Sequence, residues 1–201
     1  MASTTISPKD VSELRLRTGA GMMDCKRALE ESGGDMDKAS EILRKKGIAK
    51  AEKRAGKVAS QGMVVSYLHH NGQVGSLVEL NCETDFVART EDFQQLARDI
   101  ALHVASADPI AVNPEDVPAE LLERERRIAE EQVAQEGKPE NIRSKIVDGK
   151  LKKFVAERTL TEQLFVRDDK KTVGQLIKEA SGKLGEVISV RRFARFKIGE
   201  V

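Results

Sequence analysis

Two cysteines and three histidines are the residues of this chain best suited to nucleophilic or metal chemistry: Cys25, Cys82, His69, His70 and His103. A nucleophilic cysteine needs an activating base and a site that stabilises the oxyanion. Cys25 has no histidine near it in the sequence, and Cys82 follows a strand whose other end abuts His69 and His70. Their spacing matches no zinc pattern. The sequence therefore predicts neither an enzyme nor a metal site, and it indicates no cofactor.

The segment NCETDFV, residues 81–87, follows an alternating strand and opens a helical pattern. Thr84 or Asp85 can cap that helix with a side-chain oxygen that accepts a backbone N–H. Phe86 and Val87 then lie on its first turn. Two interpretations are open: Phe86 fills the core beneath the turn, which the pattern alone favours, or it points outward as a wedge for a partner.

A second block, TGAGMMDCK at residues 18–26, presents the same choice with two methionines. Met22 and Met23 either fill the core of a small helical bundle or form an exposed apolar contact, for which the adaptable methionine side chain is suited. The residues alone leave both interpretations open.

The composition restricts the class of protein that holds these blocks. Of the 201 residues, 33% are charged and 3% are aromatic, which suits a helix-rich fold rather than an all-β sandwich. The formal net charge of +1 argues against direct nucleic-acid binding. Residues 44–57 carry seven Lys or Arg and one acid. We interpret this run as a solvated linker face, because no aromatic residue is interleaved for base stacking.

Nothing in the sequence predicts a membrane or secreted protein. No apolar run is long enough to span a bilayer, and the N-terminal segment has no secretory signal pattern. Two cysteines imply no disulfide framework. We therefore expect a cytoplasmic protein with no membrane association.

Helical patterns near the N-terminus predict a three-helix bundle over residues 1–47. Ser7–Asp10 is typical of a helix start, with a capping serine and a proline at the first position. A second helix follows from Met22 or Met23. A third is expected after Asp35 and is predicted to end at Gly47. The expected core positions of the first helix are Val11, Leu14 and Leu16.

The remaining chain is predicted to be a basic linker helix, residues 48–60, and a core domain, residues 61–201. Asn71-Gly72 between two alternating segments is a strong hairpin signal. A third strand is expected over 187–198, and its alternating apolar positions are Ile188, Val190, Ala194, Phe196 and Ile198. Helical spacing predicts helices near 91–106, 119–136, 137–158 and 173–180. The predicted fold class is α+β, with a three-stranded antiparallel sheet covered by helices.

Taken together, TGAGMMDCK and NCETDFVA resemble the elongation factor Ts family in residues, order and spacing. The segments DGKLKKF, LTEQLFV and KTVGQL, which begin at residues 148, 160 and 171, resemble it too, so the resemblance covers essentially the whole chain. It implies a guanine nucleotide exchange factor of translation elongation. Such a factor binds elongation factor Tu in its GDP-bound and nucleotide-free forms and promotes GDP release by displacing Mg²⁺.

The resemblance also implies roles for particular residues. Four match the family segment that displaces Mg²⁺ from the partner: Thr84, Asp85, Phe86 and Val87. Four others align with positions that contact the partner's nucleotide-binding domain: Arg15, Met22, Met23 and Lys26.

The chain departs from family members that carry a duplicated core half, because it has room for a single core subdomain. By analogy with short members, this implies a homodimer that rebuilds the paired core. The exposed edge of a three-stranded sheet supplies a physical motive for such pairing.

Alternatives from other classes remain. The N-terminal bundle also resembles the ubiquitin-associated (UBA-like) fold, which leaves open an adaptor or binding module without exchange activity, since a fold does not determine a function. A thiol enzyme predicts an acidic cysteine thiol, and an RNA-binding protein predicts steep salt dependence.

Overall fold

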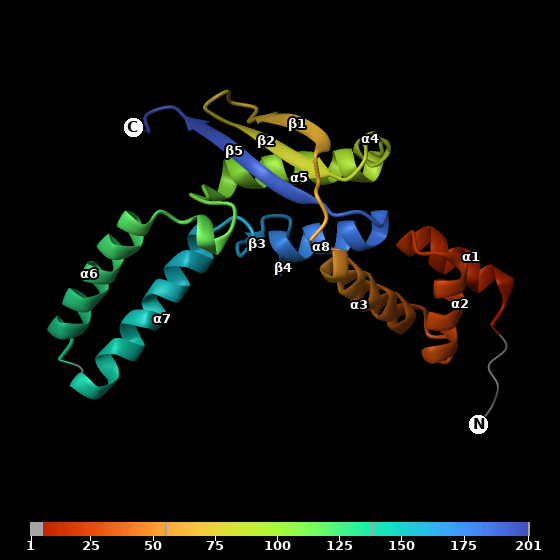
Figure 1. Cartoon of the computed structure of the whole chain (residues 1–201), viewed down its shortest axis with the longest axis horizontal. Helices are drawn as coiled ribbons and strands as arrows, with labels where there is room; N and C mark the ends of the chain where they lie inside the picture. The colour runs from red at the N-terminus through yellow and green to blue at the C-terminus, as the bar shows by residue number, and fades with distance from the viewer. Residues whose placement is uncertain (1–5, 55, 138, 201) are drawn as a thin grey trace. The chain divides into compact units, whose positions relative to one another are not determined.

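The computed structural model describes residues 6–54, 56–137 and 139–200 (Figure 1). It contains helices and strands in an α+β arrangement, which confirms the predicted fold class. The helices are α1 (Pro8–Thr18), α2 (Met22–Glu31), α3 (Met36–Arg54), α4 (Asp85–Ala88), α5 (Glu91–Ala107), the short 3₁₀ helix η1 (Pro114–Asp116), α6 (Ala119–Gln135), α7 (Glu140–Arg158) and α8 (Val173–Leu184). The strands are β1 (Gln61–Leu68), β2 (Val74–Cys82), β3 (Leu164–Phe165), β4 (Asp168–Thr172) and β5 (Ser189–Lys197).

The chain divides into two compact units. The first comprises Met1–Met63, Leu80–Leu96 and Ile177–Ser189, and the second comprises Val64–Glu79, Ala97–Leu176 and Val190–Val201. Residues 15–26 and 84–87, the two blocks that the sequence singles out, both belong to the first unit.

The first three helices form a bundle in the first unit, drawn in red and orange in Figure 1. Ser7 and Asp10 form the predicted capping box at the start of α1, and Gly19 ends the helix in a left-handed conformation. The bundle core consists of Val11, Leu14, Cys25, Ala28, Leu29, Ala39 and Leu43.

The predicted inward position of Leu16 is wrong, because its side chain is exposed. Leu16 follows the buried Leu14 by two positions. Successive residues of a helix are about 100° apart, so the two side chains point to nearly opposite faces.

The predicted helix end at Gly47 is also wrong, since α3 continues to Arg54. Gly47 does not have the positive φ that a C-terminal glycine cap requires. A Cβ atom built on Gly182 of α8 would lie 2.6 Å from the carbonyl carbon of Gly47. Gly47 therefore does not terminate the helix, and the close approach of the two helix backbones depends on the missing side chain of Gly182.

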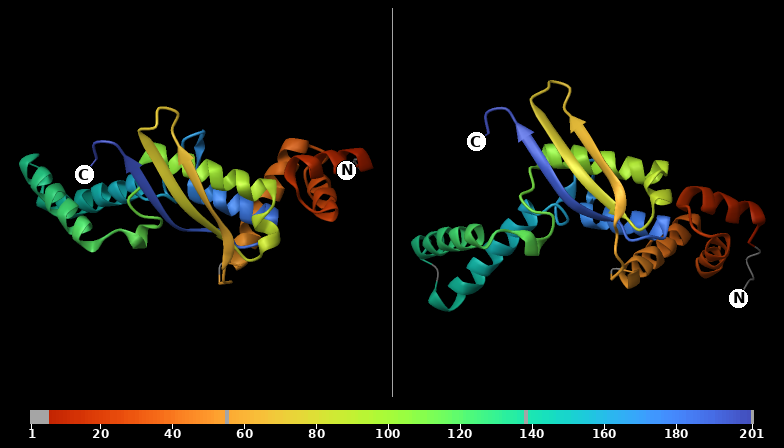
Figure 2. Two further views of the ribbon diagram at one scale, coloured as in Figure 1. Left: turned by 90° about the horizontal axis from the view of Figure 1, so that it is seen from above. Right: turned by 45° about the horizontal axis from the view of Figure 1, so that its top comes forward.

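In the three-stranded sheet, β2 lies between β1 and β5 (Figure 2). The predicted hairpin joins β1 to β2, with Gly72 at φ 69° and the His69 N–H donating to Val74 O at 2.8 Å. In the second unit, Ser76 Oγ of β2 donates to Ala101 O of α5 at 2.7 Å, which ties the sheet to the helix that covers it. The antiparallel pair of β3 and β4 is an element that the sequence patterns did not predict.

Strand β5 departs from the predicted alternation. Val190 is buried, but Phe196 and Ile198 are 69% and 75% exposed. Phe193 and Arg195 are the half-buried positions of the strand's second half, and Arg195 Nε donates to Ala105 O at 3.1 Å. The inward-facing residues thus change from even to odd numbers along the strand, which leaves Phe196 on the open side.

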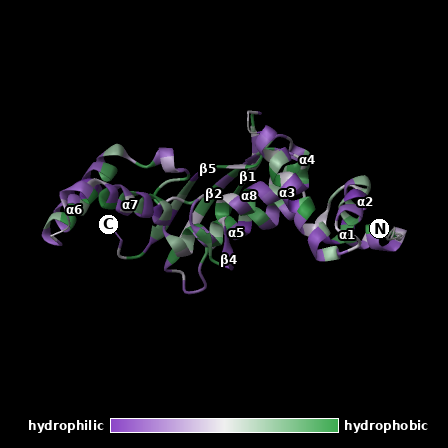
Figure 3. Cartoon of the chain, turned by 90° about the horizontal axis from the view of Figure 1, so that it is seen from below, coloured by the Kyte–Doolittle hydropathy of each residue, from purple (hydrophilic) through white to green (hydrophobic). Residues whose placement is uncertain are grey.

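The helices α6 and α7 form a hairpin in the second unit whose core contains Ala129, Val133 and Val147. Its residues are mostly coloured as hydrophilic in Figure 3, in keeping with their high charge. Among the helices of the described residues, none combines the length and the apolar character that crossing a membrane requires.

A buried polar cluster holds the segment that follows α7. Gln163 Nε2 donates to Glu157 O at 2.8 Å and to Ala107 O at 3.2 Å. His103 Nε2 lies 3.0 Å from Gln163 Oε1, and His103 Nδ1 accepts the N–H of Val166 at 3.3 Å. Because Nδ1 is an acceptor and both Gln163 amide hydrogens are engaged, the network assigns His103 the neutral form with its proton on Nε2.

Candidate functional site

The turn between β2 and α5 carries the first predicted block. Thr84 has extended backbone angles and its hydroxyl accepts the N–H of Val87 at 3.4 Å, so Thr84 is the N-cap of the four-residue helix α4. On this short helix, the side chain of Phe86 is 79% exposed. The interpretation of Phe86 as a core residue is therefore wrong in this structure.

The neighbours of Phe86 are held by local contacts. Asp85 pairs with Arg89 one helical turn later, at 2.7 Å; the Arg89 side chain is largely exposed and that of Asp85 about half exposed. Such an exposed pair contributes little to stability, which leaves the Asp85 carboxylate available to another cation. Val87 is half-buried, and its carbonyl accepts the Thr90 hydroxyl at 2.7 Å.

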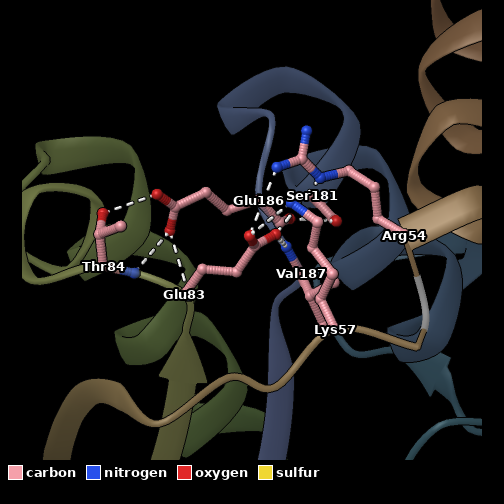
Figure 4. Close-up of polar contacts among 7 residues, drawn as sticks. All are labelled: Arg54, Lys57, Glu83, Thr84, Ser181, Glu186 and Val187. Atoms are coloured by element: carbon pink, nitrogen blue, oxygen red, sulfur yellow. Dashed lines mark hydrogen bonds and ion pairs between the residues drawn. The ribbon is translucent and has the colours of Figure 1, made fainter.

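Two glutamates connect the start of this turn with the segment that follows α8 (Figure 4). Glu186, which follows α8, accepts the N–H groups of Glu83 and Thr84 at 3.1 and 3.0 Å and the Thr84 hydroxyl at 2.6 Å. Glu83 in turn accepts the N–H of Val187 at 2.8 Å. It also pairs with Arg54 at the end of α3 and with Lys57, at 3.3 and 3.2 Å.

These contacts keep Glu83 charged. The N–H of Val187, followed by the guanidinium of Arg54, lowers the pKa of Glu83 from 4.5 to about 2. The carboxylate therefore holds the end of α3, the following linker and the start of the turn together at neutral pH.

The second predicted block lies on the bundle. Met22 and Met23, at the start of α2, are 49% and 64% exposed, which contradicts their interpretation as core residues. Arg15 and Lys26 are exposed as well, and Lys26 is 3.9 Å from Glu30. The structure thus places all four predicted residues on the exposed side of α1 and α2.

Lys183, near the end of α8, contacts the loop of this second block. A Cβ on Gly19, at the start of the loop between α1 and α2, would lie 2.7 Å from Cε of Lys183. The Lys183 ammonium continues to Asp92 of α5 and pairs with it at 2.8 Å. The C-terminal end of α8 consequently contacts the loop before Met22 as well as the turn before Phe86.

The basic run is largely neutralised within the first unit. Its bases pair with acids of other elements as Arg44–Glu179, Lys46–Glu31, Lys50–Asp24, Arg54–Glu83 and Lys57–Glu83. The hydrogen bond from Lys50, with that from Arg27, lowers the pKa of Asp24. These pairs place five bases of the run beside acids of α2, α8 and the start of the turn.

The two cysteines lie in the interior of the protein, where both are buried. Cys82 donates its S–H to Thr84 O at 3.1 Å, and burial raises the pKa of its thiol, so the nucleophilic thiolate is disfavoured. Within the described ranges 6–54, 56–137 and 139–200, no three His, Cys, Asp or Glu side chains are grouped so that they could hold a metal ion.

Three residues near the two blocks were not among the site residues predicted from the sequence. Leu16 is an exposed apolar residue between Arg15 and Arg17, and its helical spacing from Leu14 could have revealed it. The other two are Glu83 and Glu186, whose hydrogen bond joins residues 103 positions apart in the sequence. No local pattern connects them.

Comparison with known proteins gives a consistent result. A family model described as Elongation factor TS matches residues 35–200. The chain is 54% identical to the Elongation factor Ts of Syntrophomonas wolfei over 195 residues, which are 97% of this chain and 91% of that protein. It is 56% identical to the Elongation factor Ts of Thermosipho melanesiensis over 195 residues, 97% of this chain and 100% of that protein. The corresponding protein of Geobacter sulfurreducens is 54% identical over 196 residues, 98% of this chain and 91% of that protein.

Proposed function

Because this chain belongs to the elongation factor Ts family of translation elongation factors, we propose that it is the guanine nucleotide exchange factor of elongation factor Tu. It binds elongation factor Tu with GDP bound and promotes release of the nucleotide. The observation that carries this proposal is the exposed Phe86 on the first turn of a capped, four-residue helix. Of the six phenylalanines, Phe86 and Phe196 are exposed, and Phe86 is the one that lies in the segment resembling the family's Mg²⁺-displacing turn.

In the proposed mechanism, Asp85 and Phe86 enter the partner near its nucleotide site, and Thr84 and Val87 set the shape of the turn. Mg²⁺ requires near-octahedral oxygen geometry and bridges GDP to the phosphate-binding loop of a GTPase. An aromatic side chain that displaces a supporting group by about an ångström weakens the Mg²⁺ contacts, and GDP is then held less tightly. By linkage, GDP weakens binding of the factor to the same extent.

The bundle supplies a second contact. Met22 and Met23 provide apolar contact area, and Arg15 and Lys26 provide ion pairs to the partner's nucleotide-binding domain. In this scheme no side chain of the chain acts as acid, base or nucleophile, so the protein is an exchange factor and not an enzyme in the chemical sense. The proposed activity places it in the cytoplasm, where translation elongation takes place.

We further propose that the protein forms a homodimer through the open face of its three-stranded sheet. Apolar side chains are exposed there on all three strands and just beyond: Val64, Leu68, Leu77, Phe196 and Ile198. Part of this face is a hollow of about 730 Å³ lined by residues of the hairpin and of the 195–200 segment. A two-fold dimer applies the same patch to itself, which suits a face with exposed apolar side chains on all three strands. The ion pair of Arg192 with Glu79 adds a charged contact between β5 and β2.

Release of a fluorescent GDP analogue from elongation factor Tu tests the proposed function. We expect the native chain to accelerate release in a manner that saturates with its concentration. A folded native chain that leaves the release rate unchanged would contradict exchange activity. In that case the UBA-like adaptor is the function to examine, through the affinity of the intact chain for a ubiquitin-fold protein.

A further inference from the structure

Glu186 contacts the Thr84–Val87 turn without belonging to it. Its carboxylate engages the two successive N–H groups that precede α4 and the hydroxyl that caps this helix, all within 3.1 Å (Figure 4). A carboxylate that accepts several such bonds holds its donors more firmly than a neutral acceptor does. The direction in which α4 leaves the sheet therefore depends on a residue of another segment.

The position of Glu186 is determined by the end of α8 and not by the turn. The helix ends at Leu184, and Gly185 then takes a φ of 75° while its N–H donates to Ser181 O at 2.9 Å. The hydroxyl of Ser181 donates to the carbonyl of Glu186. These two contacts with Ser181 hold the backbone from which the Glu186 side chain reaches the turn.

The bracing is reciprocal. Glu83 and Glu186 each accept a main-chain N–H from the other's segment, since Val187 donates to the Glu83 carboxylate. Glu83 also extends the connection to Arg54 at the end of α3. Glu186 thus holds Thr84, the first residue of the turn, and Val187 and Arg54 hold the preceding Glu83. Phe86, two residues after Thr84, remains exposed.

We propose that Glu186 is a positioning residue that orders the Thr84–Val87 turn before the partner binds, so that Phe86 is presented in one direction. This inference rests on the proposed exchange function. A wedge that becomes ordered only in the complex loses part of its interaction free energy to that ordering. Because the bundle makes a separate contact, a loosened turn lowers the plateau rate of GDP release more than it raises the concentration for half-saturation.

Amide hydrogen exchange of the free protein tests the ordering directly. In Glu186→Ala we expect the N–H groups of Glu83 and Thr84 to exchange at least about tenfold faster, since each loses its acceptor. The N–H of Leu29 in the bundle core should exchange at the native rate. Unchanged exchange at Glu83 and Thr84 would overturn the proposal, as would a uniform acceleration that includes Leu29.

The kinetic arm uses the same variant with fluorescent GDP bound to elongation factor Tu. The plateau rate should fall about tenfold or more, with less than about a threefold change in the half-saturating concentration, as expected for loss of pre-ordering. Glu186→Gln, which keeps an acceptor oxygen, should recover most of the plateau rate. The matched control is Glu52→Ala, which removes a carboxylate paired with Lys178 on the same unit. A larger effect on half-saturation than on the plateau would contradict the proposal.

The two arms separate failure of this inference from failure of the proposed function. If the native chain does not accelerate GDP release, the exchange function fails, while amide exchange still reports whether Glu186 orders the turn. Should Glu186→Ala not fold, Glu186→Asp provides the same test, because it keeps the charge and withdraws the carboxylate by one methylene. The same directions are expected, and native behaviour of Glu186→Asp in both arms would overturn the proposal.

Discussion

Gly182 in α8 and Gly47 in α3 lie backbone to backbone, and the contact is asymmetric. A Cβ on Gly182 would lie 2.6 to 2.8 Å from three main-chain atoms of Gly47. A Cβ on Gly47 would lie 3.5 Å from the nearest atom of Gly182, which is ordinary van der Waals contact. One of the two glycines is therefore required by packing, and the other is not.

We expect Gly182→Ala to destabilise the protein by about 2 kcal/mol, because neither backbone can move aside without disturbing a helix. Gly47→Ala should be neutral or stabilising by up to about 1 kcal/mol, since alanine has the higher helix propensity. Urea unfolding of the two variants, followed by far-ultraviolet circular dichroism, measures both. Equal effects of the two substitutions would contradict the asymmetric contact.

Phe86→Ala should separate function from stability. Its side chain is 79% exposed, so we expect the free energy of unfolding to change by less than about 0.5 kcal/mol. The plateau rate of GDP release should fall about 30-fold, the consequence of losing a contact worth about 2 kcal/mol. The control is Val58→Ala, which shortens another exposed apolar side chain of the first unit. A marked loss of stability in Phe86→Ala would instead show that Phe86 packs against the protein.

Stability should fall as the pH is lowered below 6.5 because of His103. Burial lowers the pKa of this histidine from 6.5, so the unfolded chain takes up its proton at a higher pH than the folded protein does. The contribution is fully present above pH 6.5 and is lost below it, at no more than about 1.4 kcal/mol per pH unit.

Urea unfolding at pH 7.5 and 5.5 measures this dependence. His103→Gln, which has no titrating ring, should be less stable at pH 7.5 but should show a smaller difference between the two pH values. His70→Gln, at an exposed position in the hairpin turn, is the control and should keep the native difference. A His103→Gln variant with the full native difference would assign the effect to other groups.

The proposed dimer predicts a specific sensitivity of the sheet face. Phe196→Asp places a charge among the exposed apolar residues of that face, and we expect it to shift the dimer to monomer in sedimentation velocity experiments at micromolar concentration. Ile142→Asp makes the same kind of change on α7 and should leave association unaltered. A native chain that sediments as a monomer throughout that concentration range would contradict the dimer.

Local patterns predicted much of the fold. The helix start at Ser7, the hairpin at Gly72 and the cap by Thr84, one of the two residues expected in that role, all depend on residues within a few positions of one another. For that reason they could be read from the sequence. The two blocks of site residues were selected by family resemblance, because the patterns alone favoured a buried Phe86.

The errors arose where distant segments decide the outcome. Gly47 has the residue type of a helix cap, but α3 continues past it, and no local pattern shows that α8 packs there through Gly182. The alternation in β5 predicted an inward Phe196, yet the inward positions change to Phe193 and Arg195. The hydrogen bonds that connect the segments of Glu83 and Glu186 join residues far apart in the sequence, and so does the contact of Lys183 with Gly19. No local sequence pattern predicts either of them.

The brace at Glu186 has a consequence for the order of synthesis. Glu186 is translated 102 residues after Thr84, whose N–H it holds. During translation the turn and its Phe86 therefore exist as sequence well before the contact that orders them can form. Nascent chains that have not yet reached Glu186 would carry every predicted binding residue but would lack the support that we infer for the turn, so competence should be acquired late in synthesis.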